Sequence, residues 1–238
     1  MTTISYFSAG VSSAVATKLM IDEIDRIIYI HIEDQHPDTL RFVKDCEAWF
    51  GKPVEIMQSQ ILTVENAILY ASFIRNPETH AVACSRLLKK SVRKELEQNN
   101  MERIRAVWGF DVKEKDRADA IVEKNQNSDH VFPLIERGIG KSVAHKILYA
   151  SGIKRPLMYK LGYPNNNCIG CVRGGMGYWN KIRVDFPEVF ASRAKLERKI
   201  GFSILGKGLW LDELDPNRGK KERPICDDCS LFCGEMKL

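Results

Sequence analysis

Strand-like and helix-like segments alternate from the start of the chain, and this order constrains the fold more than any other feature. Segments with strand character cover residues 4–8, 27–32, 54–57, 105–108 and 131–133. Helical patterns lie between them, at residues 13–21, 38–50, 86–97 and 114–124. Because strands that alternate with helices form parallel sheets covered on both faces, we predict an α/β fold with a parallel sheet and helices on both faces.

The strand signals stop after about residue 135, and helical stretches at residues 141–150 and 189–199 follow. A length of 238 residues suits one to two domains. We therefore predict a nucleotide-binding domain over residues 1–178 and a helical, cysteine-containing cap over residues 179–238. No apolar run is long enough to span a membrane and the N-terminus lacks a signal peptide, so we expect a cytoplasmic protein without membrane contact.

Charge is distributed unevenly along the chain. The net charge is +5, but residues 120–238 hold 20 basic and 13 acidic side chains, whereas residues 1–119 hold 16 and 18. A basic excess of this size fits a nucleotide or nucleic acid, and it fits a solvated surface equally well. The charge alone does not select a function.

The segment Ser8-Ala9-Gly10-Val11-Ser12-Ser13 lies where the first strand passes into the first helix. Small residues there allow backbone N–H groups to approach an anion, and the helix N-terminus adds a favourable potential. The loop is not a Walker A motif, because no Gly-Lys-Ser/Thr follows. A phosphate or pyrophosphate site is one interpretation, and a serine-rich turn with a helix cap is the other.

Four segments in order resemble the PP-loop ATP pyrophosphatases and the sulfonucleotide (PAPS) reductases. They are Ser8-x-Gly10-x-x-Ser13, the acidic strand end at Asp34, the Cys84–Lys89 segment, and Gly109-Phe110-x-x-x-Glu114-x-x-Arg117. Ala9 and Ser12 stand where that family has Gly and Asp. The reductases' C-terminal Glu-Cys-Gly-x-His is absent, and Phe232-Cys233-Gly234-Glu235 is the nearest match. The resemblance implies a Rossmann-like sheet of the adenine nucleotide alpha hydrolase type.

The resemblance also implies an activity, which is hydrolysis of ATP to AMP and pyrophosphate with Mg²⁺, so that an acceptor is adenylylated. It assigns nucleotide binding to Ser8, Ala9, Gly10, Ser12, Ser13, Asp34, Gly109 and Phe110. It assigns the catalytic cations to Arg86, Lys89 and Arg117, although the basic stretch around Arg86 also suits a solvated helix face. We expect the acceptor to be a nucleic acid or a small molecule. The sequence is compatible with either a monomer or a homodimer.

Two other functions compete with this expectation. A phosphoadenylylsulfate or adenylylsulfate reductase would use the same nucleotide site together with a nucleophilic thiol, for which Cys233 is the candidate. A metal-binding module for nucleic acid would use the basic second half without catalysis.

Five of the seven cysteines lie in the last third of the chain, in Cys168-x-x-Cys171 and Cys226-x-x-Cys229-x-x-x-Cys233. Paired thiolates of this spacing hold Zn²⁺ or an iron–sulfur cluster. The iron–sulfur adenylylsulfate reductases are similar in placing a further ligand upstream, at Cys84, but this chain has Ala83 where their second cysteine stands. We therefore expect a 4Fe-4S cluster or Zn²⁺ on ligands from Cys84, Cys168, Cys171, Cys226, Cys229 and Cys233, with Cys46 buried and inert.

Overall fold

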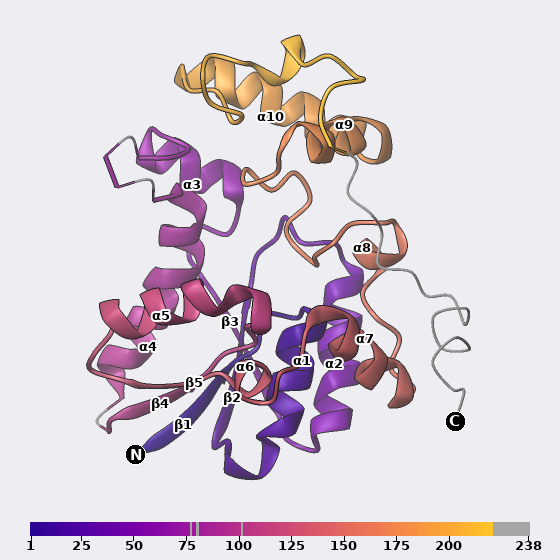
Figure 1. The fold of residues 1–238 in the computed structure, drawn as a ribbon. Helices are drawn as coiled ribbons and strands as arrows, with labels where there is room; N and C mark the ends of the chain where they lie inside the picture. Colours follow the sequence, from indigo (N-terminus) through magenta and orange to yellow (C-terminus); the bar gives the residue numbers. More distant parts are fainter. Residues whose placement is uncertain (77, 80, 101, 221–238) are drawn as a thin grey trace.

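The computed structural model describes residues 1–76, 78–79, 81–100 and 102–220. Within these residues five strands form one parallel sheet of order β3-β2-β1-β4-β5 (Figure 1). The strands are β1 (Thr2–Tyr6), β2 (Arg26–His31), β3 (Val54–Gln58), β4 (Ile104–Val107) and β5 (Asp129–Val131). The predicted α/β class and parallel sheet are confirmed, and the strand order is that of a Rossmann-like fold.

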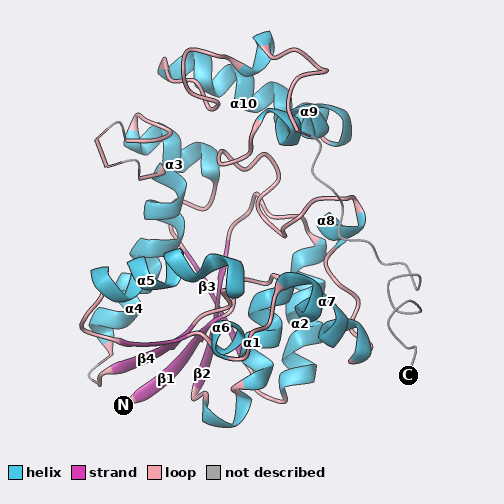
Figure 2. Ribbon diagram, viewed as in Figure 1, coloured by secondary structure: helices cyan, strands magenta, loops and turns pink. Residues whose placement is uncertain are grey.

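Helices cover the two faces of the sheet unequally (Figure 2). One face packs against α1 (Val11–Leu19), α2 (Asp38–Phe50) and α7 (Lys141–Ala150), with the short α6 (Pro133–Glu136) beside them. Its core is large and includes Phe7, Tyr29, Phe42 and Leu148. On the other face Leu96 of α4 (Ser91–Asn99) packs against Ile4, Ile28, Ile104 and Ala106, a much smaller cluster.

Several element boundaries differ from the sequence prediction. The strand expected at residues 131–133 lies at residues 129–131, because Pro133 starts α6 and cannot donate to a strand ladder. Among the helices of eight or more residues, two were not predicted, α3 (Val64–Ala71) and α9 (Met176–Asp185). The first has only 8 residues, and the second begins in a glycine-rich segment. The last predicted helix is longer than expected, as α10 (Pro187–Ile200).

A second core joins the C-terminal helices to the half of the chain that contains the sheet. Trp179, Ile182 and Leu196 share one buried cluster with Ile68 of α3 and Leu88 of the π-helix η2 (Ser85–Lys90). In Figure 1 α9 and α10 lie beyond the carboxyl ends of the strands. The predicted boundary at residue 178 falls inside α9, so residues on both sides of it contribute to this core.

Remaining helices connect these layers, namely α5 (Lys115–Lys124), α8 (Leu157–Lys160) and the one-turn segments η1 (Ile21–Glu23), η3 (Val112–Glu114) and η4 (Leu211–Glu213). None of the helices in the described ranges is long and apolar enough to cross a membrane.

Candidate functional site

The loop from Ser8 to Ser13, called the serine loop below, follows β1 and leads into α1. Its centre is the Ser13 hydroxyl, which accepts the backbone N–H groups of Ser8 and Gly10 at 3.2 Å each and donates to the Gly10 carbonyl at 2.9 Å. The Ser8 hydroxyl adds a fourth hydrogen bond at 3.0 Å. Ser13 is buried and Ser8 is exposed. Ser13 therefore shapes the loop from inside, while Ser8 faces outward.

Ala9 occupies a backbone conformation that L-residues seldom adopt. Its φ is +56° and its side chain is fully buried, at the position where the PP-loop family has glycine. The left-handed turn directs the Ala9 carbonyl to the side-chain amide of Asn166, which donates to it at 2.8 Å. This substitution thus retains a glycine-like conformation, which the contact with Asn166 stabilises.

Tyr159 of α8 fastens the start of α1. Its hydroxyl accepts the Val11 N–H at 3.3 Å, inside the main core. The N-terminal N–H groups of a helix have no partner within the helix, so this contact satisfies one of them. Neither Tyr159 nor Asn166 was predicted, because both lie about 150 residues from the loop they hold.

Gly109 brings the end of β4 against the serine loop. A Cβ at this position would lie 2.3 Å from the Ser13 Cα and 2.7 Å from its backbone nitrogen, so only glycine allows the approach. The resemblance assigns Gly109 to nucleotide binding, and in the structure its close contact is with the serine loop itself. Since β1 and β4 are adjacent and the connections diverge there, the serine loop and Gly109 lie at the switch point of the sheet, where α/β proteins bind ligands.

Phe110 and Arg117 form a separate group next to this point. The Phe110 ring stacks on Phe132 with centroids 5.9 Å apart, and the Arg117 guanidinium lies 4.5 Å from the Phe110 centroid. Arg117 also pairs with Glu114 in the preceding turn, and its side chain is 66% exposed. In the structure Arg117 is therefore a surface cation beside an aromatic pair, close to the switch point.

Three cysteines come together at the carboxyl end of β2. A bridge between Gln35 and Cys168, together with a hydrogen bond of 2.8 Å from Ile169 N–H to the Asp34 carbonyl, holds the Cys168-x-x-Cys171 turn there. The Tyr178 hydroxyl accepts the Cys171 N–H at 2.8 Å and donates to the Cys168 carbonyl at 3.2 Å. Cys84 contributes from the start of η2. We call Cys84, Cys168 and Cys171 the thiol cluster.

Burial and neighbouring charges oppose each other in the thiol cluster. Burial raises the pKa of Cys168 to about 12, against the lowering effect of Lys89. The pKa of Cys84 is also raised, first by burial and then by Cys171, while Lys89 and Arg173 lower it. Burial therefore favours the neutral thiols. The nearby Lys89 and Arg173 favour the thiolate form, which a bound group would also stabilise.

A π-helix places Lys89 beside the cysteines. In η2 the Ser91 N–H bonds the Arg86 carbonyl, an i→i+5 pattern that is rare and frequent at functional sites. This pattern turns residues five apart, such as Cys84 and Lys89, toward the same side. The α-helical geometry expected from sequence would have separated them. Arg86 instead lies 5.5 Å from the ring of Phe73.

Asp34 is occupied by contacts within the protein. One carboxylate oxygen accepts the Val64 N–H at 2.7 Å, and the other pairs with the buried Arg193 of α10. Glu65 lies 3.8 Å from the same guanidinium. The expected contact of Asp34 with adenosine stays a prediction, and the structure gives Asp34 a second role in anchoring α10. Sequence reasoning missed Arg193, since its partner lies 159 positions away.

Most of the predicted residues thus fall into three groups, one of which is Phe110 with Arg117. Ser8, Gly10, Ser13 and Gly109 meet at the switch point, and the thiol cluster with Lys89 lies at the end of β2. A cavity of about 110 Å³ opens beside Cys171, Arg173 and Tyr178. Ser12 is half-buried in the first turn of α1.

Three of the six predicted metal ligands, Cys84, Cys168 and Cys171, lie in the described part of the chain. Among the described residues, no three His, Cys, Asp or Glu side chains form a group that could hold a metal ion. Cys226, Cys229 and Cys233 lie outside the described residues. Cys46 is fully buried in α2 as predicted, and burial raises its pKa.

Comparisons with known proteins add no relative. No protein-family model matches the chain. No curated protein matches it either.

Proposed function

We propose that this chain binds ATP at the serine loop and splits it between the α- and β-phosphates, transferring AMP to an acceptor and releasing pyrophosphate. The observation that carries the proposal is the place of the loop, at the switch point of a parallel sheet and at the N-terminus of α1. The resemblance of this loop to the PP-loop of ATP pyrophosphatases supports the choice of ATP. As the bond between the α- and β-phosphates breaks, AMP is transferred to the acceptor's nucleophile and pyrophosphate leaves.

The residues of the serine loop would have different roles. The exposed residue Ser8 and the backbone around Gly10 and Ser12 would contact the pyrophosphate, and the Ser8 hydroxyl would exchange its hydrogen bond to Ser13 for one to the ligand. Ser13 and Ala9 would maintain the shape of the loop. Lys89, Arg86 and Arg117 would stabilise negative charge that develops in the transition state. Mg²⁺ would neutralise the pyrophosphate as it leaves.

The thiol cluster would hold a 4Fe-4S cluster or Zn²⁺. Soft thiolates suit both, and the cations Lys89 and Arg173 favour the anionic form that either group needs. Cys84, Cys168 and Cys171 do not form a metal-holding group by themselves among the described residues, so either site would need further ligands. An iron–sulfur cluster would use these three with a fourth from Cys226, Cys229 or Cys233, and Zn²⁺ would use Cys168, Cys171, Cys226 and Cys229. Binding would remove the protons that burial retains on the free thiols.

Pyrophosphate release tests the reaction. The full chain is incubated with ATP and Mg²⁺ and with tRNA, DNA or small acceptors in turn. We expect release that depends on one acceptor class and is lost in Gly10→Val. If no acceptor raises release and phosphoadenylylsulfate is reduced instead, the protein is a reductase and the proposal fails. Nucleic-acid binding with neither activity supports the non-catalytic module.

Metal content tests the thiol cluster independently. Protein purified anaerobically should contain about four iron and four sulfide, or about one zinc, per chain. Cys84→Ser distinguishes these, because the iron–sulfur ligand set includes Cys84. We expect loss of iron and visible absorbance if a cluster is bound, and unchanged zinc if Cys168, Cys171, Cys226 and Cys229 form the site. Protein with neither metal contradicts both forms.

A further inference from the structure

Two aromatic rings and one cation form a stack just after Gly109. The Phe110 ring stacks on Phe132 with centroids 5.9 Å apart and an angle of 21° between the planes, and the Arg117 guanidinium lies over Phe110 at 4.5 Å. We call Phe110, Phe132 and Arg117 the Arg117 stack. Both rings are half-buried, whereas the Arg117 side chain is 66% exposed. The stack therefore ends in solvent with a guanidinium.

Contacts within the protein hold the Arg117 stack in place. Trp108, which directly follows β4, lies 6.0 Å from Phe110, and the Arg93 guanidinium covers its ring at 5.1 Å. Glu114 pairs with Arg117. Hydrogen bonds to a guanidinium lie in its plane, so this pair occupies an edge of the group. The face that is turned away from Phe110 stays accessible to a planar ligand.

The charged side chains of α5 are separated by sign around the helix. At about 100° per residue, the exposed Lys124 lies roughly 20° from Arg117 around the axis and about 10 Å along it. The exposed acids Asp116, Asp119 and Glu123 share an arc of roughly 60° on another side of the helix. The stripe that contains Arg117 is therefore cationic. A planar stacking surface beside cations is what single-stranded nucleic acids bind, through their bases and phosphates.

The strand order places the Arg117 stack beside the proposed reaction site. Phe110 directly follows Gly109, which contacts Ser13 of the serine loop. The resemblance assigns adenosine to Asp34, beyond the end of β2, and the sheet order is β2-β1-β4 at this point. The adenosine position and the stack thus lie on opposite sides of the serine loop, which follows β1. A base on the stack therefore belongs to a second molecule and not to ATP.

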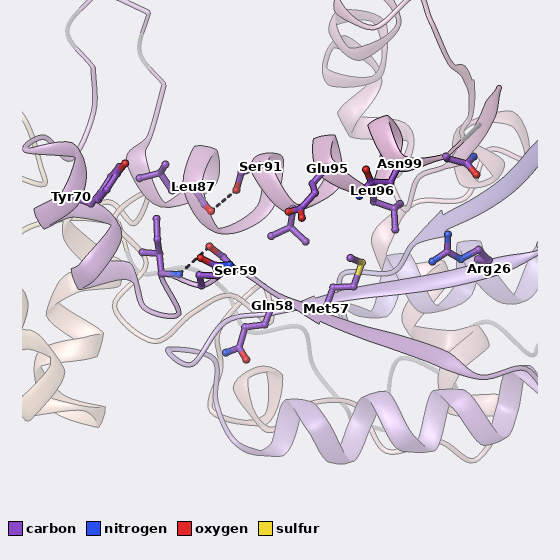
Figure 3. Close-up of a pocket in the computed structure, with 14 residues that line it drawn as sticks. Arg26, Met57, Gln58, Ser59, Tyr70, Leu87, Ser91, Glu95, Leu96 and Asn99 are labelled. Atoms are coloured by element: carbon purple, nitrogen blue, oxygen red, sulfur yellow. Dashed lines mark hydrogen bonds between the residues drawn. The ribbon is translucent and has the colours of Figure 1, made fainter. Parts of the chain in front are cut away.

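A cavity of about 670 Å³ near the end of β3 lacks this combination of groups (Figure 3). Tyr70, Ser91 and Glu95 are among its lining residues. Arg26 is the only cation of the described lining, and Glu55 binds it through two hydrogen bonds of 2.8 and 2.6 Å. This balance of charge disfavours phosphate groups, so the cavity serves below as a control position.

We propose that the Arg117 stack binds a single-stranded nucleic acid, with one base on the outer face of the Arg117 guanidinium and a phosphate at Lys124. This strand would be the acceptor of AMP, an assignment that rests on the proposed function. Every base has a π-face, so the stack itself should select no sequence. A guanidinium keeps its charge and its N–H edges when a base covers one face, so the transition-state role of Arg117 is compatible with stacking.

Fluorescence anisotropy of the full chain with a fluorescein-labelled oligo-dT of about fifteen residues, without ATP, tests the proposal. We expect binding that weakens as salt is added. Arg117→Lys keeps the charge but loses the planar surface, and it should weaken binding at least about fivefold. A strand of the same length without bases keeps its phosphates. The wild type should bind this abasic strand more weakly than oligo-dT by a similar factor.

Two control variants should bind oligo-dT as the wild type does. Arg103→Lys changes another exposed arginine that pairs with a carboxylate, Asp129, just before β4 begins. Ser91→Trp fills the cavity near the end of β3. Circular dichroism of each variant confirms that it is folded.

Three results would overturn the proposal. The first is no binding of oligo-dT, or equal binding by Arg117→Lys and the wild type. The second is equal binding of the abasic strand, which leaves attraction between charges alone. The third is loss of binding in Ser91→Trp, which assigns the strand to the cavity.

Calorimetry with ATP separates this inference from the proposed function. Protein that binds ATP but no strand contradicts the Arg117 stack and leaves the proposed reaction with another acceptor. Protein that binds the strand as predicted, but neither binds ATP nor releases pyrophosphate, contradicts the reaction and the acceptor role together. In that case the stack stands as a binding site for nucleic acid.

Discussion

The serine loop and the thiol cluster lie at the same edge of one sheet but are held by different forces. Uncharged contacts fix the loop, through the Ser13 hydroxyl, Tyr159 and the backbone approach of Gly109. A buried ion pair, Asp34 with Arg193, fastens the region of the thiol cluster, whose cysteines form no disulfide among the described residues. The loop should therefore respond to changes of shape, and the cluster to changes of charge and pH.

The largest loss of stability should come from breaking the Asp34–Arg193 ion pair near the thiol cluster. Arg193→Met leaves the Asp34 carboxylate without its cation, and losing one partner of a buried pair costs about 3–5 kcal/mol. Urea unfolding measures this loss. The control Arg198→Met removes exposed pairs with Asp212 and Glu213, which solvent screens, and should leave the urea midpoint close to that of the wild type. Equal small losses would show that apolar packing alone holds α10.

The second-largest loss of stability should come from a steric clash at the serine loop. Gly109→Ala forces a Cβ against the Ser13 backbone, where little can move, and should cost about 3 kcal/mol as well as nucleotide affinity. Gly175→Ala, with nothing within 4 Å of its Cβ, is the control and should cost about 0.5 kcal/mol. Thermal unfolding compares the two. A stable Gly109→Ala protein that binds ATP normally would contradict the tight contact.

A smaller effect is expected from one hydrogen bond of the loop. Tyr159→Phe removes the acceptor of the Val11 N–H in a buried setting and should destabilise the fold by about 1–2 kcal/mol. Tyr70→Phe, at an exposed position, should change the unfolding free energy by under about 0.5 kcal/mol. If both variants unfold like the wild type, Tyr159 does not fasten α1.

The smallest effect at neutral pH concerns the thiols. Burial raises the pKa of Cys168 to about 12, so in reduced, metal-free protein alkylation of Cys168 by iodoacetamide should be slow at pH 7 and keep rising through pH 10. The unfolded chain releases this proton at lower pH, near 8.5. The folded state then binds more protons, and its stability falls as pH rises above that value. Peptide mass spectrometry measures the labelling, and a plateau near pH 8 would contradict the burial argument.

Local patterns predicted the parallel sheet and the position of the serine loop, because each depends on neighbours in sequence. The contact of Gly109 with Ser13 was not predicted, because the two residues lie far apart in the chain. The residues that hold the site in place, such as Arg193 and Asn166, contact residues that are distant in sequence. Arg193 lies in a charge-rich helix, where one more cation gives no signal, and its role comes only from the fold. Asn166 stands in a run of three asparagines, where nothing local distinguishes it from its neighbours.

Helix geometry explains another difference between prediction and structure. The spacing of Arg86 and Lys89 predicts a shared cationic face, but η2 is wound as a π-helix and directs Lys89 to the cysteines. Propensity does not distinguish a π-turn from an α-turn, since tertiary packing decides it.

Calorimetry with ATP and Mg²⁺, on the wild type and on Gly10→Val, tests the central claim most directly. A Cβ at Gly10 makes only ordinary contacts, the nearest at 3.5 Å from the Tyr159 hydroxyl, so the variant should fold while its side chain fills the space beside the Ser8 and Ser13 hydroxyls. We predict one ATP per wild-type chain and at least about tenfold weaker binding in the variant. Equal affinity of both proteins for ATP, or no binding of ATP by the wild type, would contradict the assignment of the serine loop.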